Sequence, residues 1–264
     1  MSQAEFETTE ILGVPYAELD YTSACNCITK WASAGEHHYV VVAPVSSLMF
    51  ARSDVQLGKV YSGASMIASD GMPIVWARRA LGRSGATRLY GPDLMLSLLE
   101  QCAGERIPVG LVGGMPERLG GLTDEIKRRF PDAEIAHASS PPFRELSDSE
   151  VRDLAEEIRN SGARVVFVAL SSPKQERLMA RLKPHLPGVQ VGVGAAFDFI
   201  PGYVKQAPAL LQRCGLEWAF RIACEPRRLW KRYATTIPPF VFGFAGQMMK
   251  QRVIGPMVGA RSAA

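Results

Sequence analysis

The chain has 264 residues, of which 47% are hydrophobic, and a formal net charge of +4. This length allows a large buried core, most simply one α/β domain with an appendage, and excludes a short peptide module. The basic residues gather in one stretch, residues 213–232, without a recognised nucleic-acid-binding module, so we expect no nucleic-acid partner. No window reaches the roughly 18 uninterrupted apolar residues that a membrane span needs. We therefore expect a cytoplasmic protein that does not cross a bilayer.

The cysteines also bear on the compartment. Their number is odd, no secretory signal precedes them, and they do not form two pairs at zinc spacing. The five are Cys25, Cys27, Cys102, Cys214 and Cys224. We expect reduced thiols in the cytosol and no zinc site.

Along the chain, the first ten residues predict a loose polar lead-in. Short apolar runs then alternate with segments of helical period, and the predicted strands are 38–43, 66–68, 108–112, 134–137, 165–170 and 189–193. Helices are expected at 93–102 and 148–160, the second with Ser147 as its N-cap. This alternation predicts an α/β fold, a Rossmann-like, mostly parallel sheet with flanking helices. A change of composition after about Tyr203 predicts a core at 1–203 and a helical basic and aromatic appendage at 204–264.

Two predicted strands are followed by glycines and a carboxylate. Asp70 follows the strand 66–68 and precedes Gly71, a position from which α/β enzymes direct a base into a cleft. The alternative is that Asp70 caps a helix at 74–81. Gly113 and Gly114 follow the strand 108–112, where glycine lets a nucleotide approach the backbone, although the stretch is not a G-x-G-x-x-G motif.

A polar stretch, S-S-P-K-Q-E at 171–176, follows the buried strand 165–170. Pro173 suits the first turn of a helix, whose free backbone N–H groups would meet an anion such as a sugar-nucleotide phosphate. Lys174 and Gln175 would add a charge and an amide. The alternative is an ordinary surface turn between a strand and a helix.

Two more stretches predict contacts with a ligand or a membrane. Asp198, in G-V-G-A-A-F-D after the strand 189–193, would accept hydrogen bonds from a ribose or a uracil, or else belong to a capped turn. Residues 215–233 combine tryptophans with arginines, which suits contact with anionic lipid or a diphosphate, or else a solvated helix with an apolar stripe. The apolar segment 237–249 is too short to span a bilayer, so we expect a membrane-surface or subunit contact.

Taken together, these motifs resemble the WecG/TagA/CpsF glycosyltransferase family (glycosyltransferase family 26), from roughly Ile11 to Tyr233. The resemblance rests on D-G-M-P-I-V-W, R-L-Y-G-P-D-L, V-G-G-M-P, S-P-P-F-R, S-P-K-Q-E, G-V-G-A-A-F-D, Q-A-P, G-L-E-W-A-F-R and E-P-R-R-L-W-K-R-Y. It implies an inverting transfer without metal or cofactor, from a UDP-sugar to a polyprenyl-diphosphate-linked sugar. The setting is synthesis of cell-surface polysaccharide or exopolysaccharide at the inner face of the cytoplasmic membrane. Homo-oligomers are expected.

The resemblance also implies residue roles. Asp70 is the general base, and Arg88 lies beside the donor sugar or its diphosphate. The residues implied in substrate binding are Gly113, Gly114, Lys174, Gln175, Glu176, Asp198, Arg221, Arg228 and Arg232. The last three belong to the appendage and would neutralise a diphosphate in the absence of a metal ion.

The chain departs from the family at two places. The T-x-N element after the first long strand is missing, since residues 41–47 read V-V-A-P-V-S-S, and Ser46 or Ser47 is left to supply a hydroxyl. Ser171 stands where relatives commonly have glycine. The alternative to an active enzyme is therefore a degenerate member that binds nucleotide sugar or partner enzymes without turnover. A nucleotide-dependent oxidoreductase is disfavoured, because no G-x-G-x-x-G follows a strand. The sugar remains open among N-acetylhexosamines, uronic acids and hexoses.

Overall fold

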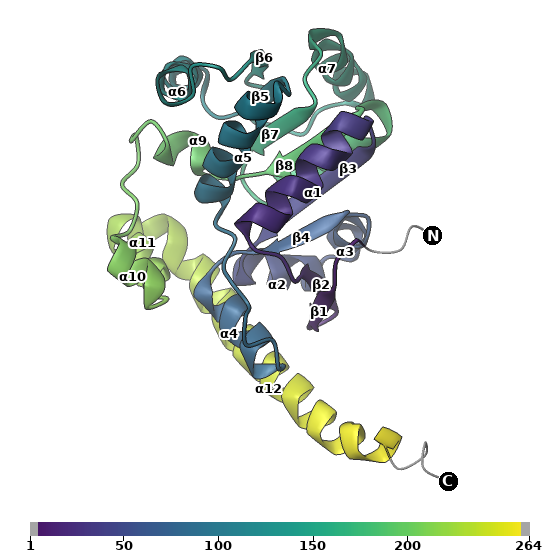
Figure 1. Ribbon diagram of the computed structural model, residues 1–264. Coiled ribbons are helices and arrows are strands. Elements are labelled where there is room, and N and C mark those ends of the chain that lie inside the picture. The colour runs from purple at the N-terminus through teal and green to yellow at the C-terminus, as the bar shows by residue number, and fades with distance from the viewer. Residues whose placement is uncertain (1–4, 260–264) are drawn as a thin grey trace.

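A six-stranded parallel sheet forms the centre of the structure (Figure 1). This computed structural model describes residues 5–259, apart from the side chains of Ala209, Arg228 and 252–259. In spatial order the strands are β4 (Met66–Ser69), β3 (His37–Ala43), β8 (Gly188–Gly192), β7 (Val165–Ala169), β5 (Val109–Gly113) and β6 (Ile135–Ser139). Every neighbouring pair is parallel, so all six carboxyl ends lie at one edge.

Helices cover both faces, because alternate residues of the central strands point to opposite sides. In β3, Val40 and Val42 join one core cluster, whereas Tyr39, Val41 and Ala43 join the other. The first cluster is covered by α1 (Tyr21–Ala34), α5 (Gly91–Glu105), α6 (Pro116–Arg129) and α9 (Ala196–Phe199). The second is covered by α2 (Val45–Ser53), α3 (Val55–Ser62), α4 (Met72–Ala80), α7 (Asp148–Ser161) and α8 (Lys174–Leu182). A short 3-10 helix, η1 (Lys183–His185), follows α8.

The predicted α/β class is confirmed, and each predicted strand overlaps an observed one. Ser147 caps α7 as expected, in a capping box with Glu150. Asp70 does not cap α4, because Gly71 occupies the N-cap position with φ +81° and no side chain accepts there.

The expectation of a loose N-terminal lead-in over the first ten residues is wrong for residues 8–10, and residues 1–4 lie outside the described residues. β1 (Thr8–Ile11) and β2 (Val14–Ala17) form an antiparallel hairpin, in which Ile11 and Tyr16 are fully buried. The two turn residues, Leu12 and Gly13, both have positive φ, as a two-residue hairpin turn requires. Leu-Gly is not the usual sequence for this turn and the strands are short, so the pattern of residues carries little signal for a hairpin.

Three helices form the C-terminal appendage: α10 (Ala209–Arg213), α11 (Glu217–Cys224) and α12 (Pro226–Gly259). Figure 1 shows α12 running past α2 and α4 and continuing beyond the core. It buries Leu229 and Phe240, and the Gln247 side chain binds the hairpin backbone, donating to Glu10 O and accepting from Leu12 N, each at 2.8 Å. The apolar segment 237–249 therefore lies inside a longer helix that packs on the core. None of the described helices has the length and hydropathy to cross a bilayer.

Candidate active site

A cavity of about 660 Å³ lies between the carboxyl ends of β3 and β4 and the appendage. Open parallel sheets bind ligands at this edge. Four of the residues that the sequence marked line this one cavity: Asp70, Arg88, Arg221 and Arg232. They come from the core and from the appendage, so the site is complete only when both are in place.

Asp70 and Arg88 are directly paired. Asp70 leaves the end of β4, and Arg88 comes from the segment between α4 and α5. The Arg88 Nε donates to Asp70 Oδ1 at 3.1 Å, its Nη2 lies 3.0 Å from the same oxygen, and the guanidinium stacks 4.0 Å from the centre of the Tyr90 ring. Both side chains are largely buried, at 13% and 20% exposed, so the pair is held in a fixed geometry.

The appendage reaches the same guanidinium. The Arg88 Nη2 donates to Glu217 Oε2 at 2.6 Å, and its Nη1 donates to Gln212 Oε1 at 3.3 Å. Burial opposes the charge on Arg88, but the carboxylates of Asp70 and Glu217 outweigh it and raise the pKa of Arg88. Burial raises the pKa of Glu217, and the Arg88 charge opposes that shift. Arg88 therefore joins the carboxylate of Asp70, which follows β4, to the first turn of α11.

The other two cavity arginines come from the appendage alone. Arg221 lies one turn after Glu217, with its guanidinium 5.7 Å from the centre of the Phe199 ring. The Arg232 Nη2 donates to Ser46 Oγ at 2.6 Å. Ser46, one of the two serines expected to supply a hydroxyl, lies in the first turn of α2 and lines the cavity. Two cations thus face the cavity near Asp70, an arrangement suited to a diphosphate.

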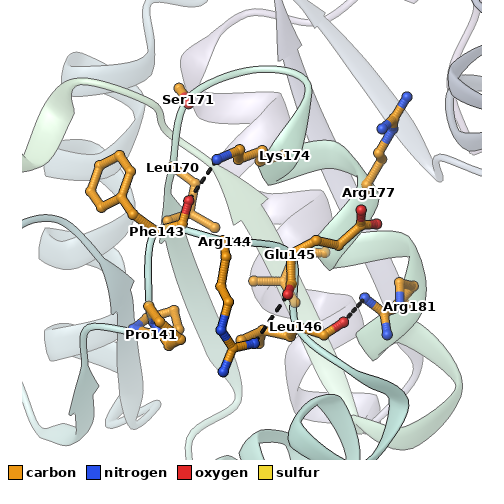
Figure 2. A pocket seen from close by; sticks show the side chains of 12 residues that line it. Pro141, Phe143, Arg144, Glu145, Leu146, Leu170, Ser171, Lys174, Arg177 and Arg181 are labelled. Carbon is orange, nitrogen blue, oxygen red and sulfur yellow. Dashed lines mark hydrogen bonds between the residues drawn. The ribbon is translucent and has the colours of Figure 1, made fainter.

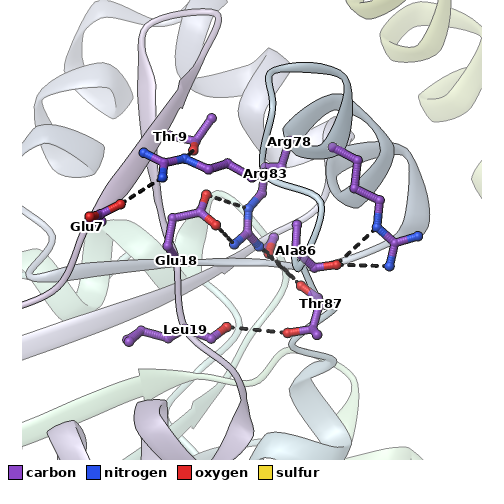
Figure 3. Close-up of polar contacts among 10 residues, drawn as sticks. Glu7, Thr9, Glu18, Leu19, Arg78, Arg83, Ala86 and Thr87 are labelled. Carbon is purple, nitrogen blue, oxygen red and sulfur yellow. Dashed lines mark hydrogen bonds and ion pairs between the residues drawn. The ribbon is translucent and has the colours of Figure 1, made fainter.

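A buried arginine, Arg78, binds the residues that precede Asp70 and Arg88, and Figure 3 shows it between Glu18 and Thr87. Arg78 of α4 is 1% exposed and pairs with Glu18, through Nε at 3.0 Å and Nη2 at 2.6 Å. Its Nη1 donates to Ser69 Oγ and, at 3.2 Å, to Thr87 O. Ser69 precedes Asp70 and Thr87 precedes Arg88. Arg78 is therefore a positioning residue for both.

Gln175 and Glu176 lie beneath the edge of the sheet rather than in the cavity. Gln175 is 3% exposed, and its Oε1 accepts from Leu170 N at 3.4 Å and from Gly194 N at 2.9 Å, which ties the ends of β7 and β8 together. Glu176 is 1% exposed, and burial raises its pKa. Its Oε2 has no hydrogen-bond partner among the described residues. Neither side chain is placed to touch a ligand in the main cavity.

Gly113 and Gly114 lie at the end of β5, and Asp198 lies in α9, which follows β8. Gly113 has φ +118°, and a Cβ there would stand 2.3 Å from Ala169 O, so glycine is required for the approach of β5 to β7. The Gly114 N donates to Ala169 O at 3.0 Å. Asp198 is half-exposed and accepts from Arg118 Nη1 at 2.8 Å. These residues do not line the main cavity.

Lys174 borders a second, smaller cavity of about 110 Å³ (Figure 2). It begins α8, and its Nζ donates to Phe143 O at 2.6 Å and lies 5.9 Å from the centre of the Phe143 ring. The S-P-P-F-R and S-P-K-Q-E motifs therefore meet across this cavity. Arg228 lies within α12, and its side chain is outside the described residues.

The five cysteines form no disulfide in the structure. Within residues 5–259, no group of three or more His, Cys, Asp or Glu side chains is arranged to hold a metal ion.

The fold and the cavity define a Rossmann-like enzyme with a charged site at the carboxyl edge of its sheet. A sequence model described as the Glycosyl transferase WecG/TagA/CpsF family matches residues 9–254, nearly the whole chain. The chain belongs to this family, which confirms the resemblance seen in the motifs. It is thus a glycosyltransferase of cell-surface polysaccharide synthesis, of a family that uses a nucleotide-sugar donor and a lipid-linked acceptor.

Sequence reasoning missed four side chains of the site: Trp76, Gln212, Glu217 and Tyr90. Trp76, Tyr90 and Glu217 stand inside motifs that carried the resemblance, so a signal was present. Gln212 had none, because its contact with Arg88 spans 124 residues of chain.

Proposed function

We propose that this protein transfers a sugar, with inversion and without a metal ion, from a UDP-sugar to a sugar hydroxyl of a polyprenyl-diphosphate-linked acceptor. The observation that carries the proposal is the Asp70–Arg88 pair in one cavity with Arg221 and Arg232. A base, a fixed cation beside it and two further cations are what this reaction needs from a protein.

In the proposed step, the acceptor oxygen attacks the anomeric carbon from the face opposite UDP. The new carbon–oxygen bond forms as the bond to the β-phosphate oxygen breaks, and UDP leaves with the electron pair. Asp70 takes the proton of the attacking hydroxyl. Arg88 holds the Asp70 carboxylate and, with Arg221 and Arg232, offsets the charge that develops on the diphosphate.

The remaining residues support the proposed donor side. Gly113, Gly114 and Asp198 stand at the same edge of the sheet, where a nucleotide would contact the backbone and a carboxylate. Lys174 borders the neighbouring small cavity. In this proposal Gln175 and Glu176 do not contact the donor. They fix the carboxyl edge of the sheet, against which the donor lies. The donor is a substrate, and no cofactor is invoked.

The proposed setting is the cytoplasmic face of the inner membrane, with peripheral association through the appendage. The exposed Trp230, Phe242 and Met249 and the local positive charge of residues 213–232 support this. Homo-oligomers and exopolysaccharide as the end product are also proposals.

The test is UDP release from a panel of UDP-sugars, with a short-chain polyprenyl-diphosphate sugar as acceptor. We expect acceptor-dependent release with one donor, and a loss of about 10²- to 10⁴-fold in Asp70→Asn. Asp148→Asn, an exposed carboxylate of α7, is the matched control and should leave the rate unchanged. Retained activity in Asp70→Asn would overturn the assignment of the base.

The second candidate is a binding protein without turnover, favoured by the missing T-x-N element and by the engagement of Ser46 with Arg232. It predicts UDP-sugar binding by calorimetry but no UDP release with any donor.

A further inference from the structure

The main cavity has two chemically different ends. Asp70, Arg88 and Arg232 stand at one end. The other end is a groove between α4 and α12, and its walls are apolar. From α4 it is lined by Trp76 and Ala80, and from α12 by Ile237, Val241 and Phe244. The described side chains of this groove carry no charge, so a fully polar ligand would leave it unfilled.

The groove is open to solvent. Trp76 is 47% exposed and Val241 is 54% exposed, although both line the cavity. Exposed apolar surface is typical of ligand grooves as well as of protein and membrane contacts, and this surface lines the same cavity as Asp70. The cavity volume of about 660 Å³ falls within the roughly 300–1,000 Å³ that ligand sites occupy. The cations at one end and the apolar walls at the other match an anionic head attached to a hydrocarbon chain.

We propose that the groove between α4 and α12 binds the first isoprenoid units of the acceptor lipid, next to its diphosphate. This inference rests on the proposed function, because it names where the lipid of that acceptor lies. The groove is continuous with the site of Asp70, so the acceptor's head and its chain occupy one cavity. The enzyme therefore recognises the lipid as well as the sugar, and does so without a bilayer present.

A different apolar surface on α12 separates this role from membrane adhesion. Phe242 is 77% exposed and Met249 is 63% exposed, and neither lines the cavity. Val241 and Phe242 are neighbours in sequence, so the same change can be made inside and outside the groove. Val241→Asp and Phe242→Asp form a matched pair, and both positions are exposed enough that folding should survive. Ala80→Trp, an exposed position on α4, fills the groove from the opposite wall.

The first experiment is calorimetric titration of the full chain, without detergent or vesicles, using farnesyl diphosphate and inorganic diphosphate below any micelle concentration. We expect farnesyl diphosphate to bind at least tenfold more tightly. Val241→Asp and Ala80→Trp should abolish that gain, while Phe242→Asp keeps it. Equal affinity for the two probes, or equal effects of Val241→Asp and Phe242→Asp, would overturn the inference.

The second experiment measures transfer to acceptors that carry one sugar on a diphosphate with a C5 or a C15 chain. We expect a lower KM for the longer chain at unchanged kcat, and the difference should vanish in Val241→Asp. Transfer that depends on Asp70 but not on chain length would refute the groove and keep the proposed function. A farnesyl-specific gain in binding without transfer to any acceptor would keep the groove and refute the proposed function.

Discussion

Arg78 offers the sharpest test of how the site is held. Its guanidinium is 1% exposed, and it pairs in two places with Glu18, whose side chain is 14% exposed. Arg78→Met keeps the apolar stem but removes the charge and leaves Glu18 largely buried without its partner. Breaking a buried pair from one side costs about 3–5 kcal/mol. In a chain of this size each kcal/mol shifts Tm by about 2–4 °C, so Tm should fall by about 10 °C.

The assay is urea and thermal unfolding of the wild type, Arg78→Met and the double variant Arg78→Met/Glu18→Leu. The double variant should recover most of the loss, because it also removes the unpaired carboxylate. Below its Tm, Arg78→Met should lower kcat more than it raises KM, because Arg78 holds the residues that precede Asp70 and Arg88. A single variant that loses under 1 kcal/mol, or a double variant less stable than the single one, contradicts this reasoning.

Three further predictions concern stability. Burial raises the pKa of Glu18, but the hydrogen bonds from Arg78 and Thr9 and the charges of Arg78 and Arg83 together outweigh it and lower that pKa below the ordinary 4.5. The stability that this pKa shift contributes is therefore complete above pH 4.5 and is lost as pH falls through the folded-state pKa, and Glu18→Gln should flatten that part of an acid titration of the free energy of unfolding. Gly113→Ala should lower the free energy of unfolding by about 1–3 kcal/mol or more, because the φ of Gly113 is positive and the new Cβ would meet Ala169 O. Gly104→Ala is the control in the same denaturant series, and it should be neutral or stabilising because Gly104 is an open helical position. Gln175→Leu should cost about 1–3 kcal/mol by leaving the partly buried amides of Leu170 and Gly194 without their acceptor, and faster hydrogen exchange at those two amides is the direct readout.

Much of the fold was readable from sequence because its signals are local. A strand that is buried on both faces has a short run of β-branched residues in its sequence, whichever strands lie beside it. The run at 165–170 predicted such a strand, and β7 spans Val165–Ala169. Ser147 could be placed because a capping box is complete within four residues. The hairpin at Thr8–Ile11 was missed because its burial depends on contacts that the hairpin makes only in the folded chain.

Part of the site was also fixed by sequence. Asp70 and Arg88 were marked as partners of one reaction by their motifs, and the structure pairs them. Arg221 and Arg232 were placed at the same site, and they line its cavity. Gln175 and Glu176 were predicted to bind substrate, and both lie at the carboxyl edge of the sheet. The sequence could not show that their side chains are buried there.

The sequence by itself therefore determined the α/β class, the order of the strands along the chain and the residues able to do acid–base and diphosphate chemistry. The tertiary structure alone decided that Glu217 reaches Arg88 across 129 residues, that Arg78 binds the residues preceding Asp70 and Arg88, and that α4 and α12 face each other as an apolar groove. The physical reason is range: propensity and pattern act within a few turns of chain, whereas these contacts exist only once distant elements pack together.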